Sequence, residues 1–117
     1  MTMAYDELLA DRIRLTLGSK NVDHSEKKMM GGIGFMVDEK LCIGIFRNEL
    51  MCRVHPEKVP EYLERQGARQ MVHGGRSMKG YLNISDEGFD MDEDLEFWVQ
   101  ACLDFNPLAK ASKKKKK

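Results

Sequence analysis

The sequence has 117 residues, of which 42% are hydrophobic and 32% are charged, as is typical of one soluble globular domain. No apolar run approaches the roughly 18 residues that a membrane-spanning helix needs, and no secretory signal is visible at the start. The net charge of zero includes five terminal lysines. Without them 14 basic residues face 19 acidic ones, which argues against a large general nucleic-acid surface. We expect a cytoplasmic protein that does not contact membranes.

The first predicted element is a helix over residues 2–17. Thr2 can cap its start, and the acidic residues that follow suit the positive end of a helix dipole. Apolar residues then recur at helical spacing, and Gly18 is a stop signal because helices commonly end at glycine. Residues 19–25 are polar and predict a loop, from which residues 26–28 lead into the next element.

Three short apolar runs, separated by charged breaks, fill residues 29–54 and predict a three-stranded antiparallel meander. If Val37 opposes Leu41 across the first turn and Asn48-Glu49 forms the second turn, side-chain alternation gathers aliphatic residues on one face. That face consists of Ile33, Phe35, Val37, Ile43, Ile45, Cys52 and Val54. We expect it to be the core.

The opposite face of the meander is unusual, because the same register puts Gly34 opposite Gly44 in the middle of the sheet. Facing glycines weaken strands and leave bare backbone, so something else should approach closely there. Two alternatives stay open, namely a helix of the same chain and a partner subunit or ligand. The candidate interaction face consists of Gly34, Met36, Gly44, Phe46, Met51 and Arg53, with Cys42 beside them in this register.

After the meander, two prolines fit the first turns of a short helix between Pro56 and Gly67. Two more strands are predicted at residues 68–72 and 78–84, joined by a glycine-rich turn at residues 73–76.

The last element is the clearest helix, with an apolar stripe from Leu95 to Cys102 and a stop at Asn106-Pro107. Asp90 and Glu93 resemble a capping box at its start. Carboxylates crowd its first two turns, where we favour dipole matching and a solvated face over a cation site, because the spacing of a calcium loop is absent.

The order of elements is therefore α-β-β-β-α-β-β-α. Because the strands cluster instead of alternating with helices, we predict an α+β fold with a mostly antiparallel five-stranded sheet and three helices. We assign residues 1–108 to a single domain and residues 109–117 to a disordered, lysine-rich tail.

The residue patterns do not indicate a catalytic chemistry. The three histidines are well separated, and the sequence has no nucleophile elbow, P-loop or dinucleotide-binding turn. Cys42, Cys52 and Cys102 include no Cys-x-x-Cys, and the first two lie in apolar strands, which favours reduced core thiols over nucleophiles. We expect no catalytic residue, no cofactor and no metal site.

Two segments could make weak contacts with polyanions. The turn near residue 76 offers backbone N–H groups and cations, although an ordinary hairpin turn is favoured. The tail can give only weak, salt-sensitive, non-specific binding to nucleic acid. The candidate contacts are Arg76, Lys79, Lys113, Lys114, Lys115, Lys116 and Lys117.

An ordered set of short motifs runs along nearly the whole chain. It comprises Tyr5-Asp6-Glu7, Glu26-Lys27-Lys28-Met29-Met30-Gly31-Gly32, Phe35-Met36-Val37, Leu50-Met51-Cys52-Arg53-Val54, Gly67-Ala68-Arg69 and Met78-Lys79-Gly80. In this order and spacing the set resembles the TfoX/Sxy N-terminal domain family over about residues 3–108. That family usually has Phe where Met30 stands, and often Pro where Ser77 stands.

The resemblance implies an α+β fold of the kind shared with type III secretion chaperones, which often pair. It also implies kinship with bacterial regulators of competence genes, which are thought to assist a cyclic-AMP receptor-type activator at promoters. Those regulators carry a second, helical C-terminal domain, where this chain has its lysine tail. The family supplies no catalytic residues.

Three functions stay open. The favoured one is a non-catalytic, regulatory protein-interaction domain that forms a homodimer through the candidate interaction face, or binds another regulatory protein. The second is direct nucleic-acid binding through Lys27, Lys28, other basic residues and the tail. The third is a small-ligand carrier or enzyme with Cys52 and Arg53 near the open side of the sheet.

Overall fold

The computed structural model describes residues 6–29, 31–73 and 75–109. In chain order the elements are α1 (Glu7–Ser19), β1 (Ser25–Met29), β2 (Gly32–Val37), β3 (Lys40–Phe46), β4 (Glu49–Arg53), η1 (Pro56–Lys58), α2 (Val59–Tyr62), β5 (Ala68–His73), β6 (Arg76–Ile84), η2 (Asp86–Gly88), α3 (Asp92–Phe105) and η3 (Asn106–Leu108). Within these ranges, no helix is long and apolar enough to cross a membrane.

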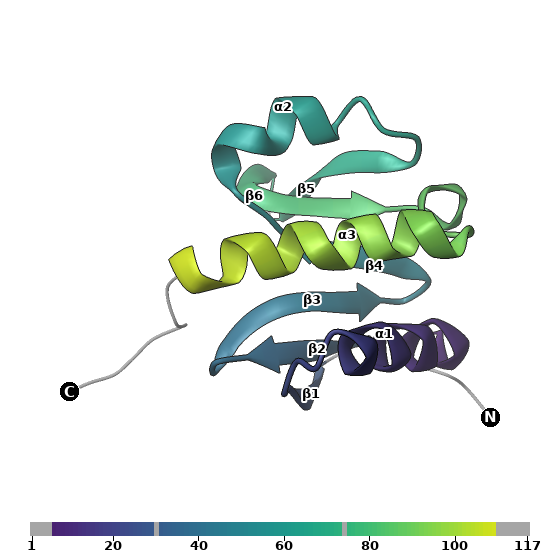
Figure 1. Ribbon diagram of the computed structural model, residues 1–117. Helices are drawn as coiled ribbons and strands as arrows, with labels where there is room; N and C mark the ends of the chain where they lie inside the picture. The colour runs from purple at the N-terminus through teal and green to yellow at the C-terminus, as the bar shows by residue number, and fades with distance from the viewer. Residues whose placement is uncertain (1–5, 30, 74, 110–117) are drawn as a thin grey trace.

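The strands form one antiparallel sheet in the order β1-β2-β3-β4-β6-β5, and α1 and α3 lie in front of it (Figure 1). The predicted α+β class is confirmed, but the predicted five strands are wrong, because the described chain has six.

Helix α1 begins later than predicted, because Asp6 is its N-cap. The Asp6 carboxylate accepts a hydrogen bond from the backbone N–H of Leu9 at 3.1 Å, which satisfies one of the free donors of the first turn. The predicted cap, Thr2, lies outside the described residues. The helix buries its predicted apolar stripe, which consists of Leu9, Ala10, Ile13 and Leu17.

Strand β1 is the element that sequence reasoning missed. It pairs with β2, with Lys27 opposite Gly34. The side chains of residues 25–28 are exposed, so the segment lacks the alternation of apolar and polar residues that reveals a half-buried strand. Its charged side chains suit an edge strand, because charge discourages edge-to-edge association with another sheet.

Strands β2, β3 and β4 confirm the predicted meander, and Gly34 opposes Gly44 as expected. The predicted pair of Val37 and Leu41 is wrong, because Val37 pairs with Lys40. The register of β2 and β3 is the predicted one as far as the pair Phe35 and Ile43. Beyond that pair it shifts by one residue, as a β-bulge produces.

Both meander turns are two-residue connections. Asp38 and Glu39 have φ angles of 54° and 65°, the left-handed conformation that tight hairpin turns require. The second turn is Arg47-Asn48 and not the predicted Asn48-Glu49, since β4 already begins at Glu49. The observed second turn is shifted by one residue from the predicted one. Cys52 and Val54 still reach the core, because the observed pairing keeps the same side chains on each face of β4.

From β4 the chain passes through η1 and α2 to the predicted β5–β6 hairpin, and β6 returns beside β4. The pairing of β5 with β6 is irregular between Gln70 and Val72. The Gln70 side-chain amide donates to the carbonyl oxygens of Met78 and Tyr81 at 2.8 and 3.1 Å, which holds the irregular segment in place.

Helix α3 lies across the front of the sheet and buries the predicted stripe of Leu95, Trp98, Val99 and Cys102. The predicted capping box of Asp90 and Glu93 is wrong, because the N-cap is Met91, which makes no side-chain capping bond. The α3 helix ends at Phe105, directly before the predicted stop at Asn106-Pro107.

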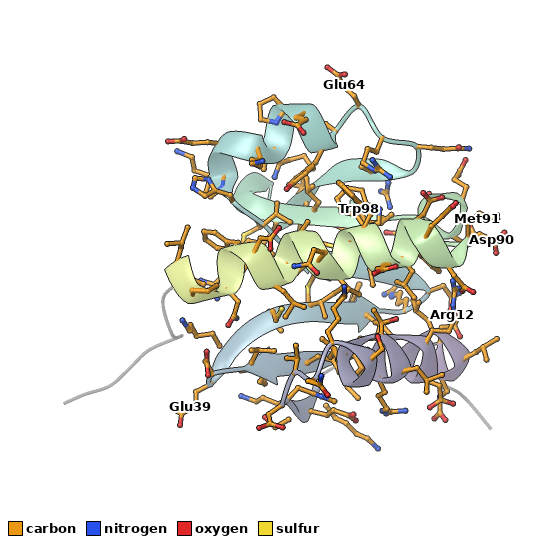
Figure 2. The ribbon with its side chains drawn as sticks, viewed as in Figure 1. Arg12, Glu39, Glu64, Asp90, Met91 and Trp98 are labelled. Carbon is orange, nitrogen blue, oxygen red and sulfur yellow. The ribbon has the colours of Figure 1, made fainter. Side chains whose placement is uncertain are left out.

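Arg12 of α1 explains why Asp90 lies outside the helix. Its Nη2 donates to the backbone carbonyls of Phe89 and Asp90 at 3.0 and 3.1 Å and to the carboxylate of Asp92 at 3.1 Å (Figure 2). This contact joins the first helix to the start of the last one.

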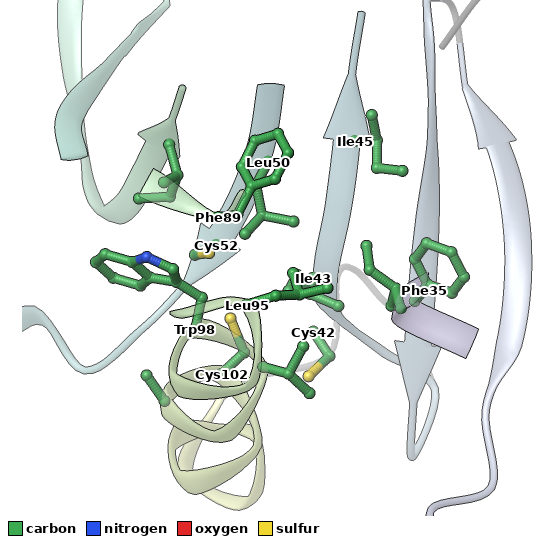
Figure 3. Packing of buried hydrophobic residues seen from close by; sticks show 14 of the residues in the cluster. Phe35, Cys42, Ile43, Ile45, Leu50, Cys52, Phe89, Leu95, Trp98 and Cys102 are labelled. Atoms are coloured by element: carbon green, nitrogen blue, oxygen red, sulfur yellow. The ribbon is translucent and has the colours of Figure 1, made fainter. Parts of the chain in front are cut away.

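The core lies between the sheet and the two long helices, where Phe35, Ile43, Leu50 and Trp98 are fully buried (Figure 3). The indole N–H of Trp98 donates to the carbonyl oxygen of Gly88 at 3.2 Å, so the buried polar atom has a partner. Ala109, the last described residue, is also buried.

Candidate interaction surface

The side of the sheet that faces away from α1 and α3 is covered by no helix of the described ranges (Figure 1). We call it the open face. From the strand pairings and side-chain alternation it includes Lys27, Gly34, Met36, Gly44, Phe46, Glu49, Met51, Arg53, Arg69, Tyr81 and Asn83. A single row crosses all six strands, in the order Lys27, Gly34, Gly44, Met51, Asn83 and Arg69.

The bare backbone at Gly44 is covered by a side chain of the neighbouring strand. The terminal methyl carbon of Met51 lies 2.8 Å from the position of a Cβ on Gly44, and the carbonyl oxygen of Ile33 lies 2.9 Å from it. Among the described residues, the side chain nearest to this position is that of Met51, so the close approach at Gly44 comes from Met51. Met51 itself is only half-buried, so its thioether remains part of the surface.

A groove of about 470 Å³ lies on the open face beside Met51, and residues of β3, β4, β5 and β6 line it. Its walls are Phe46, Glu49, Met51, Arg69, Gln70, Met71, Val72 and Asn83. Two of its apolar side chains are well exposed, Phe46 at 44% and Val72 at 60%. Exposed apolar side chains lining a concave surface are typical of a contact site.

Guanidinium groups lie over aromatic rings at two places on this side of the sheet. The Cζ of Arg53 lies 5.6 Å from the ring centre of Tyr81, and the Cζ of Arg47 lies 5.2 Å from that of Phe46. Both distances suit cation–π attraction. Arg69 forms an ion pair with Glu49, the acidic residue of the open face.

All six residues of the candidate interaction face lie on the open face, and their role as an interaction surface stays a prediction. Cys42 does not join them, since it is 1% exposed and packs in the core near Cys102 (Figure 3). The register shift explains the error, because it places Leu41 opposite Met36 while Ile43 stays opposite Phe35, leaving Cys42 as the extra residue. Cys52 is fully buried as well, so it is not near the open side.

Sequence reasoning did not place Lys27, Arg69, Tyr81 and Asn83 on this surface. Alternation within residues 78–84 could have paired Tyr81 with Asn83 on one face. The pairing of β4 with β6, which brings them beside Arg53 and Met51, joins segments about thirty residues apart and has no local signal.

The glycines of the family motif have structural reasons. Gly31 has a φ angle of 80°, and its carbonyl oxygen accepts from the N–H of Arg47 at 2.8 Å. A side chain on Gly32 would collide with the carbonyl oxygen of Ile45. Gly80 has a φ angle of 82°, and its carbonyl accepts from Val54 N–H at 2.8 Å.

Other motif residues are partly described. Met78 is half-buried and Lys79 is exposed. Met30 lies outside the described residues, and so does the side chain of Met29.

Of the candidate polyanion contacts, the structure describes the side chain of Lys79 alone. It lines a shallow pocket of about 290 Å³ together with Arg53, Tyr81 and Leu108, close to the end of the described chain. The side chain of Arg76 and residues Lys113 to Lys117 lie outside the described part.

The three thiols lie in the core. Burial raises the pKa of the Cys42 thiol and of the Cys102 thiol, so both stay protonated at neutral pH. Among the residues that the structure describes, no group of His, Cys, Asp or Glu side chains could hold a metal ion.

The acidic start of α3 is occupied by ion pairs. Asp92 pairs with Arg12 at 3.1 Å and Asp94 with Arg65 at 3.4 Å. Glu96 pairs with Lys20 at 3.2 Å. These contacts are those of the predicted solvated, charge-matched surface.

The family model described as the TfoX N-terminal domain matches residues 19–106, which is most of the chain. No curated protein and no solved structure matches. The likeness to type III secretion chaperones that the resemblance implied stays a prediction. On the match to its family model, this chain belongs to the TfoX N-terminal domain family.

Proposed function

We propose that this chain is a non-catalytic, regulatory protein-interaction domain, similar to the N-terminal domain of competence regulators, and that the open face is its binding surface. The observation that carries the proposal is the placement of α1 and α3 on one side of the sheet. The other side keeps an apolar groove between Phe46 and Val72 in contact with solvent.

The composition of the open face supports a protein partner. Aromatic residues, methionine and arginine are enriched at the centres of protein–protein interfaces, and Phe46, Met51, Arg53 and Tyr81 are of these types. The homodimer that the sequence favours stays a prediction, and a second copy is one possible occupant of the same surface.

The test is site-specific photo-crosslinking in the native host. A photoreactive residue replaces Phe46 on the open face, and in a matched protein it replaces Leu15, which is 74% exposed on α1. Protein adducts that form from position 46 and not from position 15 would support the proposal. Equal adducts from both positions, or nucleic-acid adducts at position 46, would contradict it.

Direct nucleic-acid binding is the second candidate, favoured by the two guanidinium–aromatic pairs at Phe46 and Tyr81. Bases stack on exposed aromatic rings in sheets that bind single strands. The same crosslinking experiment separates this function from protein binding, because the adducts differ in kind.

A further inference from the structure

The two edges of the sheet differ in their side chains. Strand β1 forms one edge, and its residues 26–28 are all charged and exposed. Arg14 of α1 also binds the Glu26 carboxylate, with hydrogen bonds of 2.7 and 2.9 Å. Charged side chains of this kind discourage the addition of a further strand. Strand β5 forms the other edge, where Arg69 is the one residue of the Lys, Arg, Asp or Glu types and Val72 is 60% exposed.

The ladder between β5 and β6 shows which backbone groups of β5 point away from the sheet. The Ser85 N–H donates to the Gly67 carbonyl oxygen at 3.0 Å, directly beside the pair that Ala68 forms with β6. Hydrogen-bonded and non-hydrogen-bonded pairs alternate in an antiparallel ladder. Ala68 and Gln70 therefore direct their N–H and C=O groups outward, away from β6.

The same direction applies to Val72, near the other end of β5. His73 and Arg76 pair across a two-residue turn, and the hydrogen bond of such a turn joins the residues that flank it. Val72 is one position earlier, so its N–H and C=O point outward.

The outer side of β5 is open at these positions. Within the described ranges, the outward groups of Gln70 and Val72 have no backbone partner. Helix α2 lies near this edge in Figure 1 but packs toward α3, where the ring centre of Tyr62 lies 5.6 and 5.7 Å from those of Phe97 and Trp98. An unpaired strand edge is a template for another extended segment.

The groove of the open face lies beside this edge. Residues 69–72 of β5 supply four of its eight lining residues, and Phe46 and Met51 are among the others. Successive side chains of an added strand point to opposite faces of the sheet, so every second one reaches the open face beside Met71. The edge and the groove therefore form one site, with free backbone groups along β5 and apolar surface next to them.

This site favours an extended segment of another protein over a second copy of the chain. The β5 strand of a second copy would present positions 69, 71 and 73 to the open side, and of these only Met71 is apolar. A helix pairs its own backbone groups, so it would leave those of Gln70 and Val72 without partners.

We propose that β5 binds an extended segment of a partner protein as a seventh strand, and that this segment carries apolar residues at every second position. The inference rests on the proposed function and names the form of its partner. The backbone of the segment pairs with the outward groups of Gln70 and Val72, and its apolar side chains enter the groove beside Phe46, Met51 and Met71.

The first experiment selects binders from a displayed library of random 16-residue peptides against the full chain. We expect peptides with Val, Ile, Leu, Phe or Met at alternate positions over about five residues. Apolar residues at the three- and four-residue spacing of a helix would overturn the inference, as would a failure to select any peptide.

N-methylation of the selected peptides tests the backbone pairing with the unaltered protein. Only every second residue of an added strand directs its N–H to β5, so a methyl group on a nitrogen of that set should weaken binding about tenfold or more. A methyl group on a nitrogen of the other set should change affinity by less than about threefold. Equal losses from the two sets would show that the peptide does not add as a strand.

Two substitutions of Val72 locate the binding edge. Val72→Pro removes an outward N–H and no hydrogen bond of the β5–β6 ladder, so the fold should persist while peptide affinity falls about tenfold or more. The control Val72→Thr keeps the N–H and a similar shape, and should lose less than about threefold. Circular dichroism checks the fold of both variants.

Equal losses of affinity in the two Val72 variants would overturn the proposal. Self-association of the unchanged protein at high micromolar concentration, measured by sedimentation and abolished by Val72→Pro, would also overturn it, because a second copy would then occupy the edge.

The two proposals can fail separately. Protein adducts from position 46 together with peptides whose affinity ignores Val72→Pro would leave the interaction domain standing and refute strand addition. Absence of any protein adduct at position 46 would refute the proposed function itself.

Discussion

The terminal methyl of Met51 occupies the space that a side chain on Gly44 would need, with 2.8 Å between the methyl carbon and the Cβ position. The two residues are direct partners across β3 and β4. The space above Gly44 is therefore filled by a side chain of the sheet itself. A substitution of Gly44 should change the stability of the fold whether or not a partner binds this face.

Gly44→Ala should destabilise the protein by about 1–3 kcal/mol, because the new methyl group also meets the Ile33 carbonyl oxygen, a backbone atom that cannot easily move. In urea unfolding, the double variant with Met51→Ala should be less destabilised than the sum of the single variants, since removal of the thioether relieves one of the two contacts. Strict additivity would contradict this packing.

Gly18 is the matched control for Gly44. A Cβ at Gly18 meets nothing within 4 Å, and the residue lies within α1. Gly18→Ala should stabilise the protein by about 0.5 kcal/mol, because it restricts the unfolded chain without a new contact. A loss of stability there as large as that at Gly44 would show that the effect is not steric.

The ion pair of Arg14 and Glu26 should make stability depend on pH. Hydrogen bonds from Arg14, at 2.7 and 2.9 Å, are the main reason that the pKa of the Glu26 carboxyl lies below its ordinary value of 4.5. A lowered pKa stabilises the folded state above about pH 4.5, and this is lost as the pH falls, because the unfolded chain takes up the proton first. The gain is at most about 1 kcal/mol, since both side chains are partly exposed.

Urea midpoints at pH 7 and pH 3 measure this effect. Glu26→Gln should lower the midpoint at pH 7 and have a smaller effect at pH 3, while Glu64→Gln, at an exposed position, is the control. An effect of Glu26→Gln that is as large at pH 3 as at pH 7 would exclude the ion pair as the cause.

The buried thiols should be inert in the folded protein. Cys42 and Cys102 have a raised pKa from burial, and Cys52 is fully buried beside them, so iodoacetamide at pH 8 should label all three slowly. In concentrated urea each thiol should react fully, and mass spectrometry can count the labelled thiols.

Thermal unfolding should change little with chelator or reductant. A drop of more than about 10 °C with either reagent, worth well over 1 kcal/mol, would contradict the absence of metal and disulfide.

The five terminal lysines should carry most of any binding to DNA. Replacement of Lys113 to Lys117 by serine should weaken binding to duplex DNA and reduce the slope of log affinity against log salt by up to about 4, since each neutralised phosphate contributes about 0.9. Fluorescence anisotropy across a salt series measures both. Retention of tight, salt-tolerant, sequence-selective binding would favour the nucleic-acid function instead.

The sequence by itself determined the meander, its central register and the stripe of α3. Those features follow from local alternation, so Ile33, Phe35 and Ile43 could be assigned to the core and Gly34 placed opposite Gly44 before the structure was known. It could not reveal β1, because an exposed edge strand such as residues 25–28 has no buried side to leave a pattern.

Only the tertiary structure decided what covers each face. The start of α3 depends on Arg12, which reaches the carbonyl of Asp90 from a helix seventy-eight positions earlier. The membership of the open face depends on the pairing of β4 with β6, which places Tyr81 beside Arg53. The position of Cys42 depends on a register shift between two strands. Contacts between distant segments decide all three, and short-range periodicity carries no information about such contacts.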